Sequence, residues 1–347
     1  MKNATTKGLI KTLSPLCQLE KSETINNKLI AVHRRDKYLI RDAENNLRAI
    51  SILAPSSNTI RAIIRDLMAA DITDALLKKE IKLGYKSLLV LYVGGGGVEK
   101  ESKRKLEEIE QLKEKNVVLS LLGASPDKII AGKTVVGMPV LLCNETVTSG
   151  LVPPRWYNDF GSSLPFYTDV LDVKQLVRHD DLQNYDVLTR LSEQGFAEME
   201  KFEVALAVKK AEKDAKKDDK KEEKPSEKKS ETSRQTIYNV ETIVPGAMFY
   251  HYITVRKPRS LEIGALLGAL RRFSADPFIG GGSNRGYGEI SINYDVSIDD
   301  EVVGTVKVND NSNRKFDIDD LSGTVLSDAL AEYDNYIENI TAEQVAI

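Results

Sequence analysis

One arginine stands within an unusually glycine-rich stretch of the chain. Residues 280–290 read GGGSNRGYGEI, which places glycines on both sides of Arg285. Glycine lets backbone approach a phosphate without a side-chain clash, its N–H groups can donate to phosphate oxygens, and arginine adds a planar fork for bidentate contact. The stretch predicts a phosphate-binding loop formed by Gly281, Gly282, Ser283, Asn284 and Arg285. A helix end and tight turn with Tyr287 in the core explains the same glycines, and both interpretations can hold together.

A run of polar residues stands where a helix is predicted to begin. After Ala54-Pro55 the chain reads SSNTIRAIIRDLM, with apolar residues at helical spacing from Ile60 to Met68. The positive end of a helix dipole favours an anion, so these polar side chains indicate a second phosphate contact that two arginines would extend along the helix. The candidates are Ser56, Ser57, Asn58, Thr59, Arg61 and Arg65. A simple helix cap is the alternative interpretation of residues 56–59.

A second glycine cluster, Gly94–Gly97, indicates a different chemistry. It stands between the apolar run KSLLVLYV, expected to be a strand, and a charged helix, which NVVLSLLG follows as a second expected strand. A glycine loop between a strand and a helix can cradle a nucleotide phosphate. Neither Gly-Lys-Ser/Thr nor a Gly-x-Gly-x-x-Gly spacing with a clean acidic partner is present, so a flexible turn is favoured. A nucleotide-binding enzyme remains the alternative function.

The composition is that of a globular protein with little scope for metal chemistry. Of 347 residues, 41% are hydrophobic and 29% charged; no apolar run approaches the ~18–20 residues that span a membrane. The N-terminus lacks the apolar core of a secretory signal, so we expect a cytoplasmic protein without a membrane partner. Cys17 and Cys143 and the three histidines form no cluster at metal spacing. Two buried, reduced thiols are expected, with no metal and no cofactor.

The net charge of −3 argues mildly against a nucleic-acid partner, but the charge is unevenly distributed. Acidic residues concentrate between Asp299 and Glu343. Basic residues form one cluster near the start of the chain and another in its C-terminal third. They are Arg34, Arg35, Lys37 and Arg41, then Arg256, Lys257, Arg259, Arg271, Arg272 and Arg285. This asymmetry predicts one basic surface on a mildly acidic protein.

Two strand–helix segments, far apart in the chain, are predicted to form one core. In the first, a strand over 7–16 and a polar excursion over 20–48, expected to be a hairpin, precede the helix that starts near Ser56. In the second, a strand pair broken at Pro245-Gly246 precedes a helix, the glycine loop and a strand. This order predicts an α+β fold of ferredoxin-like or RRM-like type, with an antiparallel sheet and helices on one face.

The motifs of these segments resemble the RAMP superfamily, the repeat-associated RNA-binding proteins of CRISPR effector complexes. Arg285-Gly286-Tyr287-Gly288 is similar to the family's loop before the last core strand, and Val244-Pro245-Gly246-Ala247 to the start of the strand before the second helix. Residues 54–61, APSSNTIR, resemble the Pro-Gly-Ser-Ser-Ile-Lys segment of the backbone subunits, although no glycine follows Pro55 and the segment is one residue longer. Length and layout resemble the Cas-seven group, and the segment Arg178–Asp181 contributes to a likeness to its type IV (Csf-two-like) form.

The resemblance implies a discontinuous palm domain with large insertions. The mixed-charge run from Lys209 to Lys229 is expected to be a solvated linker, because it has almost no apolar residue to bury. The end of the chain, 328–347, is expected to form a polar helix. The implied parts are a palm of 1–74 and 237–298, an inserted loop over 20–48, a finger-like region over 75–207, a charged linker and thumb over 208–236, and an acidic extension over 299–347.

The resemblance also implies a function. It indicates a non-catalytic subunit that binds guide RNA (crRNA), polymerises head to tail along it, and presents it for pairing with target DNA or RNA in defence against mobile elements. Phosphate contacts suit this role, because they are blind to sequence and leave bases free to pair. Further expected partners are Cas-five-like, Cas-six-like and large subunits and a helicase. The family places RNA at the helix start, and Arg34, Arg35, Arg234 and Tyr238, the last two in the thumb, join the candidate RNA-binding residues.

A catalytic alternative comes from the same resemblance. The segment Asp36–Asp42, DKYLIRD, is similar to the loop in which type III backbone subunits carry an aspartate that cuts target RNA. Asp36 is therefore the one catalytic candidate, for a metal-dependent endonuclease. A lone carboxylate among three basic residues also serves as simple charge balance, and the sequence offers no metal partner or general acid for it.

Overall fold

A computed structural model describes residues 3–25, 28–41, 46–95, 105–125, 129–160, 163–179, 235–321 and 323–345, together with Gln194, Ala197 and Lys201. It contains two compact units, residues 1–174 with 240–347 and residues 175–239. Strands β8 (Leu171–His179) and β9 (Gln235–Ile243) each run from one unit into the other. The linker expected between Lys209 and Lys229, together with Arg234 and Asp42, lies outside the described residues.

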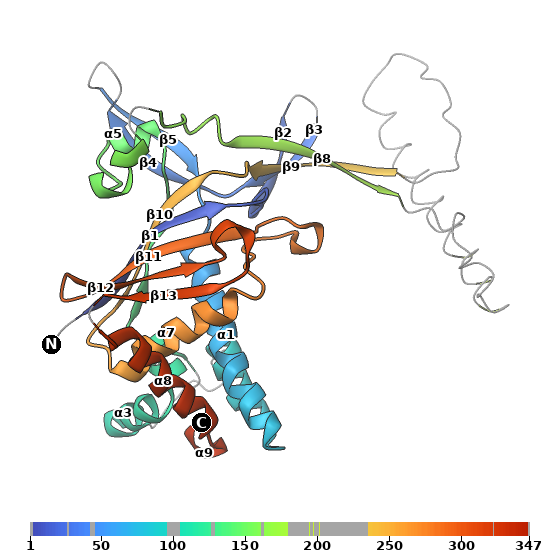
Figure 1. Ribbon diagram of the computed structural model, residues 1–347. Coiled ribbons are helices and arrows are strands. Elements are labelled where there is room, and N and C mark those ends of the chain that lie inside the picture. Colours follow the sequence, from blue (N-terminus) through green and yellow to red (C-terminus); the bar gives the residue numbers. More distant parts are fainter. Residues whose placement is uncertain are drawn as a thin grey trace, which may run out of the picture. The chain divides into compact units, whose positions relative to one another are not determined.

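The larger unit is built on a seven-stranded antiparallel sheet in the order β13-β12-β11-β1-β10-β6, with β7 also paired to β10 (Figure 1). Its strands are β1 (Ala4–Thr12), β6 (Thr134–Val136), β7 (Val140–Leu141), β10 (Met248–Val255), β11 (Ile290–Ile298), β12 (Glu301–Val308) and β13 (Phe316–Asp320). The inner order β11-β1-β10-β6, with one helix after β1 and one after β10, is that of a split βαβ, or ferredoxin-like, fold. The α+β prediction is confirmed.

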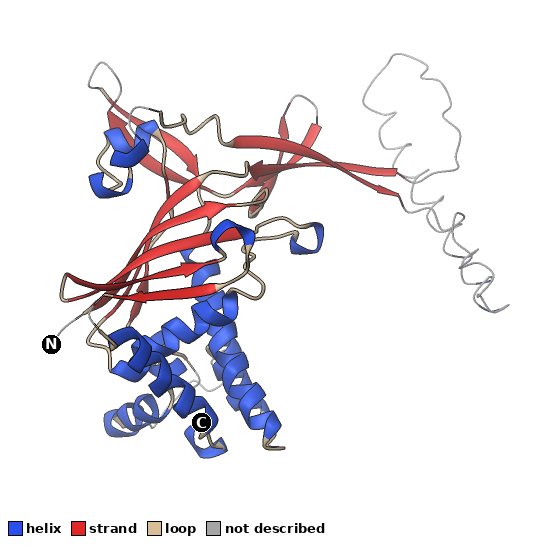
Figure 2. Ribbon diagram, in the orientation of Figure 1, coloured by secondary structure: helices blue, strands red, loops and turns tan. Residues whose placement is uncertain are grey.

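Helices cover one face of this sheet (Figure 2). The principal ones are α1 (Ser57–Lys78), α7 (Ser260–Phe273) and α8 (Val325–Glu338). Side chains alternate along β10, so Phe249, His251 and Ile253 are buried against the helices. A Cβ on Gly264 would lie 1.9 Å from the carbonyl oxygen of Ala329, so only glycine allows α7 and α8 to approach so closely. The expected terminal helix is present as α8 and α9 (Ala342–Val345), and α8 is part of this packed layer.

The excursion after β1 forms two hairpins rather than one. β2 (Leu19–Ile25) pairs with β3 (Lys28–His33), and β4 (Arg35–Arg41) pairs with β5 (Leu47–Leu53). The first hairpin belongs to a four-stranded sheet of order β2-β3-β9-β8, and the second forms a two-stranded sheet. Short helices α5 (Asn144–Thr148), η1 (Pro154–Trp156) and η2 (Asn158–Phe160) follow β7.

Both strands expected around Gly94–Gly97 are helices, so the prediction of a strand–glycine–helix unit was wrong. They are α2 (Tyr85–Val93) and α4 (Val117–Leu122), with α3 (Leu106–Lys115) between them. All six residues of α4 are buried, and a short, fully buried apolar run looks the same in a strand and in a helix. Gly94 ends α2 in the left-handed conformation at φ 80°. The glycines therefore follow the negative end of a helix dipole, whereas a phosphate cradle needs the positive end.

Two buried histidines make stability depend on pH. Burial is the main cause that lowers the pKa of His33 and of His251 to about 4, from an ordinary value of 6.5. The stabilisation that comes from keeping these two imidazoles neutral is complete above pH 6.5 and is lost as pH falls towards 4. Between these values the unfolded chain binds protons that the folded chain does not, which favours unfolding.

We expect the free energy of unfolding to fall by about 2 kcal/mol per histidine between pH 7.5 and pH 5. Urea titrations at the two pH values measure this loss. His251→Gln should reduce the difference between them, and an unchanged difference in that variant would contradict the assignment.

None of the helices in the described residues is long and apolar enough to cross a membrane.

Candidate nucleic-acid interface

The glycine-rich loop lies against the segment that follows β1. The N–H of Gly281 donates to the carbonyl of Cys17 at 2.7 Å, and that of Gly288 to Pro15 at 2.8 Å. Two left-handed glycines make this approach possible, since a Cβ on Gly280 would lie 2.4 Å from the Cys17 oxygen and one on Gly288 2.0 Å from the Ile279 oxygen. The close approach predicted for these glycines is therefore made to the protein's own backbone.

The tip of the loop is a single 3₁₀ turn, Ser283–Arg285, flanked by left-handed Gly282 and Gly286. The side chains of this turn are exposed, whereas Tyr287 is half-buried. Burial raises the pKa of the Cys17 thiol. The charge of the nearby Arg285 acts in the opposite direction and has the smaller effect. The turn thus presents one cation and two polar side chains to solvent beside residues 15–17.

The predicted helix start lies at the same segment. Ser56 is the N-cap of α1, as expected, and its Oγ accepts from the N–H of Asn58 at 3.2 Å. Gln18 bridges the cap, because its Oε1 accepts from the N–H of Ser56 at 2.9 Å and its Nε2 donates to Thr59 Oγ1 at 2.8 Å. Residues 15–18 therefore contact both predicted phosphate-binding elements. Sequence reasoning missed Gln18, because its partners lie 38 and 41 positions later in the chain and no local signal marks it.

Arg61 and Arg65 turn inward and bind helix ends. Arg65 is 8% exposed, and its guanidinium donates to the carbonyls of Val90 and Leu91 at the end of α2 and to those of Leu122 and Gly123 at the end of α4. Arg61 donates to the carbonyls of Leu122 at 2.6 Å and Thr134 at 3.1 Å. Burial lowers the pKa of Arg65 to about 10, so it stays charged at neutral pH. Both arginines donate to carbonyls at helix ends, and Arg61 also donates to Thr134 in β6.

Asp36, the catalytic candidate, is bound by a neighbouring arginine. Arg34 Nη1 and Nη2 donate to its two carboxylate oxygens at 2.8 and 2.5 Å, and Arg34 Nη1 also donates to the carbonyl of Ala54. The pair thus fastens the start of β4 to the end of β5, just before the cap of α1. Among the described residues, no group of three or more His, Cys, Asp or Glu side chains is placed to hold a metal ion.

Arg35 pairs with a buried acid, Glu241. Its Nη2 donates to Glu241 Oε1 at 2.9 Å, while Glu241 Oε2 accepts from the N–H of His33 at 2.9 Å. Glu241 is almost fully buried, so this arginine compensates a carboxylate that would otherwise be costly to bury. Arg234 lies outside the described residues, and Tyr238 lies in β9.

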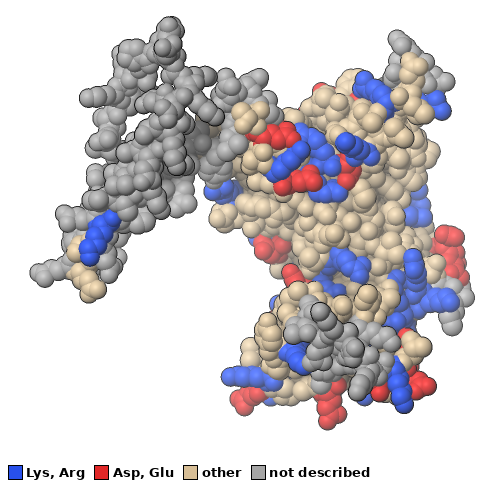
Figure 3. Space-filling view, turned by 180° about the vertical axis from the view of Figure 1, so that it is seen from behind, with Lys and Arg blue, Asp and Glu red and all other residues tan. Residues whose placement is uncertain are grey.

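The single basic surface expected from the sequence is not what these arginines form. Arg271 pairs with Asp334, and Arg272 pairs with Asp71 and Asp74. Figure 3 shows basic and acidic side chains side by side on one face of the molecule. The acidic partners come from distant parts of the chain. The clusters of basic residues in the sequence therefore predicted a larger basic surface than these arginines form.

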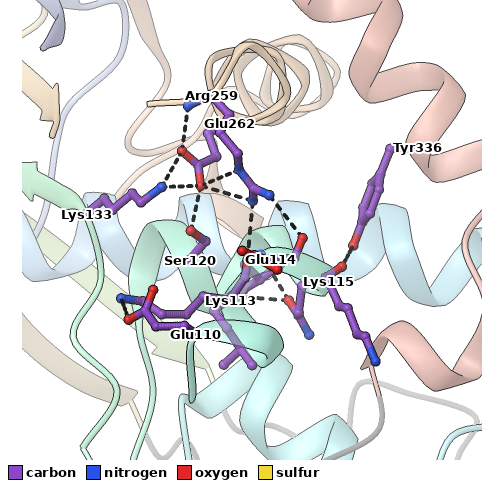
Figure 4. Close-up of polar contacts among 12 residues, drawn as sticks. Glu110, Lys113, Glu114, Lys115, Ser120, Lys133, Arg259, Glu262 and Tyr336 are labelled. Atoms are coloured by element: carbon purple, nitrogen blue, oxygen red, sulfur yellow. Dashed lines mark hydrogen bonds and ion pairs between the residues drawn. The ribbon is translucent and has the colours of Figure 1, made fainter. Parts of the chain in front are cut away.

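A buried carboxylate organises the helical layer (Figure 4). Glu262, at the start of α7, is fully buried and accepts from Lys133 Nζ at 2.8 Å, Ser120 Oγ at 2.5 Å and the N–H of Arg259 at 2.8 Å. Arg259 in turn donates to the carbonyls of Lys113 and Glu114 at the end of α3. Burial would raise the pKa of Glu262, but these hydrogen bonds and the Arg259 charge together lower it. The cluster is structural, and it removes Arg259 from the candidate basic surface.

The two cysteines are free and buried, as predicted. Burial raises the pKa of both thiols, that of Cys143 to about 11, so neither is poised for nucleophilic chemistry.

Comparisons with known proteins find likenesses among solved structures. No family model and no curated protein matches the chain. A solved structure described as "Type IV-B CRISPR Complex" contains a chain that is similar at 12% sequence identity and a TM-score of 0.42, covering 86% of this chain and 90% of that chain. This likeness is too distant to carry an argument about function, so the proposal below depends on the residues and the fold of the present chain.

Proposed function

We propose that the chain is a guide-RNA-binding backbone subunit of a class 1 CRISPR effector complex, of the type IV form, without catalytic activity of its own. The observation that carries the proposal is the convergence of the glycine loop and the N-terminus of α1 on residues 15–18. These are the two elements whose motifs resemble the RAMP superfamily. The split βαβ order of the sheet is the topology that such a palm requires.

The proposed contact is made to phosphates. Arg285 supplies a guanidinium on the exposed turn, Ser283 and Asn284 supply neutral donors, and the first turn of α1, which holds no acidic residue, supplies the positive end of a helix dipole. Arg61 and Arg65 are left out because they bind carbonyls of α2 and α4. Such contacts hold RNA of any sequence. Copies of the chain would then line up head to tail along the guide, an arrangement that does not close.

The experiment is RNA retention by the Arg285→Ala variant. We expect affinity for a single-stranded RNA to fall about tenfold and the slope of log affinity against log salt to decrease by about 0.7, because one phosphate contact is lost. Arg271→Ala is the matched control, since it removes one cation from α7 in the helical layer. Equal losses in both variants, or no loss in Arg285→Ala, would contradict the proposed site.

Asp36 is proposed to position Arg34 rather than to cut RNA. Asp36→Asn should leave target RNA uncut, as in the parent complex assembled with guide and Mg²⁺, and should lower the thermal midpoint, because the Arg34 fork loses its charged partner. Gel analysis of labelled target RNA tests this point. Cleavage by the parent that Asp36→Asn abolishes would establish the endonuclease instead.

A further inference from the structure

The sheet face opposite the helices carries aromatic and basic side chains on its two central strands. On β10, Tyr250 and Tyr252 alternate with the buried Phe249, His251 and Ile253, so both tyrosines project from the outer face. On β1, Lys7 and Lys11 project from the same face, and Lys7 lies directly across from Tyr252. Arg155 and Trp156 reach this face from η1. We call these six residues the sheet platform: Lys7, Lys11, Arg155, Trp156, Tyr250 and Tyr252.

The three rings of the platform form a continuous run. Ring centroids are 6.2 Å apart between Trp156 and Tyr250 and 6.5 Å apart between Tyr250 and Tyr252. Tyr252 keeps 36% of its surface exposed. Its ring lies against Gly137, where a Cβ would come within 2.5 Å, and Gly137 N–H donates to the Tyr252 carbonyl at 2.9 Å. The ring therefore lies against backbone while the residue as a whole stays partly exposed.

The charges around the rings favour an anionic ligand. Arg155 lies over the Trp156 ring at 5.3 Å and pairs with Asp295 on β11, which Lys7 faces from the other strand. Within the described residues, the ammonium groups of Lys7 and Lys11 have no ion-pair partner. The platform thus combines flat apolar rings with a net positive charge, the combination that binds the bases and backbone of a single strand without reading its sequence.

We propose that the sheet platform is a base-stacking site for unpaired nucleotides of single-stranded RNA. It rests on the proposed function for the identity of its partner, and it adds a contact made through bases to the phosphate contact at Arg285. Stacking is tolerant of sequence, because every base has a π face. The site would therefore hold a stretch of RNA that is not engaged in pairing.

The single tryptophan of the chain makes the test direct, because Trp156 belongs to the platform. The probes are an oligouridylate and an abasic oligomer of the same length and charge. We expect the oligouridylate to quench Trp156 fluorescence on saturation and the abasic oligomer to leave it unchanged. Tyr252→Leu should lower oligouridylate affinity about tenfold, whereas Tyr252→Phe, which keeps the ring, should retain it. Tyr85→Leu, at a tyrosine 78% exposed on α2, is the matched control and should have no effect.

The outcomes separate this proposal from the one before it. Binding that depends on Arg285 but shows neither quenching nor dependence on the Tyr252 ring overturns the platform and leaves the phosphate site intact. Absence of RNA binding by every form overturns both. Self-association without RNA that Tyr252→Leu abolishes would make the face a protein interface and also overturn the platform. The thermal midpoints of the parent and of Tyr252→Leu serve as the folding control. If they are equal, a change in RNA affinity reports the loss of the ring and not a loss of folding.

Discussion

Replacement of Glu262 by alanine is expected to lower the free energy of unfolding by about 3 kcal/mol or more at neutral pH. The side chain is fully buried and accepts from Lys133, Ser120 and Arg259. Without this carboxylate, the Ser120 hydroxyl and the cations of Lys133 and Arg259 lose their shared acceptor. The contacts that hold the start of α7 to α4 and α3 are then weakened. Urea unfolding followed by circular dichroism measures the change.

Two further variants show whether the loss of stability in Glu262→Ala comes from its buried charge. Glu110→Ala removes an exposed carboxylate, 66% accessible, that pairs with Lys113, and it should cost at most about 0.5 kcal/mol. Glu262→Gln keeps the shape but not the charge. Because the pKa of Glu262 is lowered in the folded protein, the contribution of its charge is present above about pH 4.3 and is lost as pH falls below that value through the folded pKa. The difference between parent and Glu262→Gln should therefore shrink at acid pH, and a gap that stays constant would refute the charge-based account.

Replacement of Arg65 by alanine is the second large expected effect, a loss of about 2–4 kcal/mol, because four hydrogen bonds from a buried guanidinium to the ends of two helices are lost. The Leu122 carbonyl keeps Arg61 as a donor and the Val90 carbonyl keeps the N–H of Gly94. Hydrogen exchange should show the greatest loss of protection in the last turn of α2, where Val90 and Leu91 contact the guanidinium. Arg65→Lys should recover only part of the loss, since a point charge cannot reach both helix ends.

The same variant also separates structure from binding. At a temperature where Arg65→Ala remains folded, its RNA affinity should equal that of the parent, whereas Arg285→Ala should bind RNA more weakly than the parent. Selective loss of RNA affinity in folded Arg65→Ala would return this residue to the interface.

The parts of the fold predicted from sequence are those whose signals are local. Alternation of apolar and polar residues predicted a strand over 7–16, which the structure places at Ala4–Thr12. A serine before an apolar helical repeat marks the start of α1. The helices α2 and α4 were missed because their apolar runs are short and buried, so their periodicity carries no information on type.

The role of Arg65 could not be predicted for a different reason. On its own helix it looks like a surface cation, but its partners are carbonyls 25 to 58 positions later in the chain. Gln18 and the Asp partners of Arg272 are likewise brought close only by the fold. By contrast, the glycine loop could be located from sequence, because the left-handed turns at Gly282 and Gly286 depend on the glycines themselves.

The central position of β1 has a consequence for the order of events during synthesis. Ala4 pairs with Val255 on one side and with Ile298 on the other, so both partners of β1 are synthesised long after it. At about 5–20 residues per second, the strand would wait roughly 12–60 s for these partners. Its two unpaired edges are exposed to wrong pairing for that time, and a sheet closed by such distant contacts also folds slowly. Production of the protein should therefore be limited by how well the nascent β1 strand is shielded until β11 emerges.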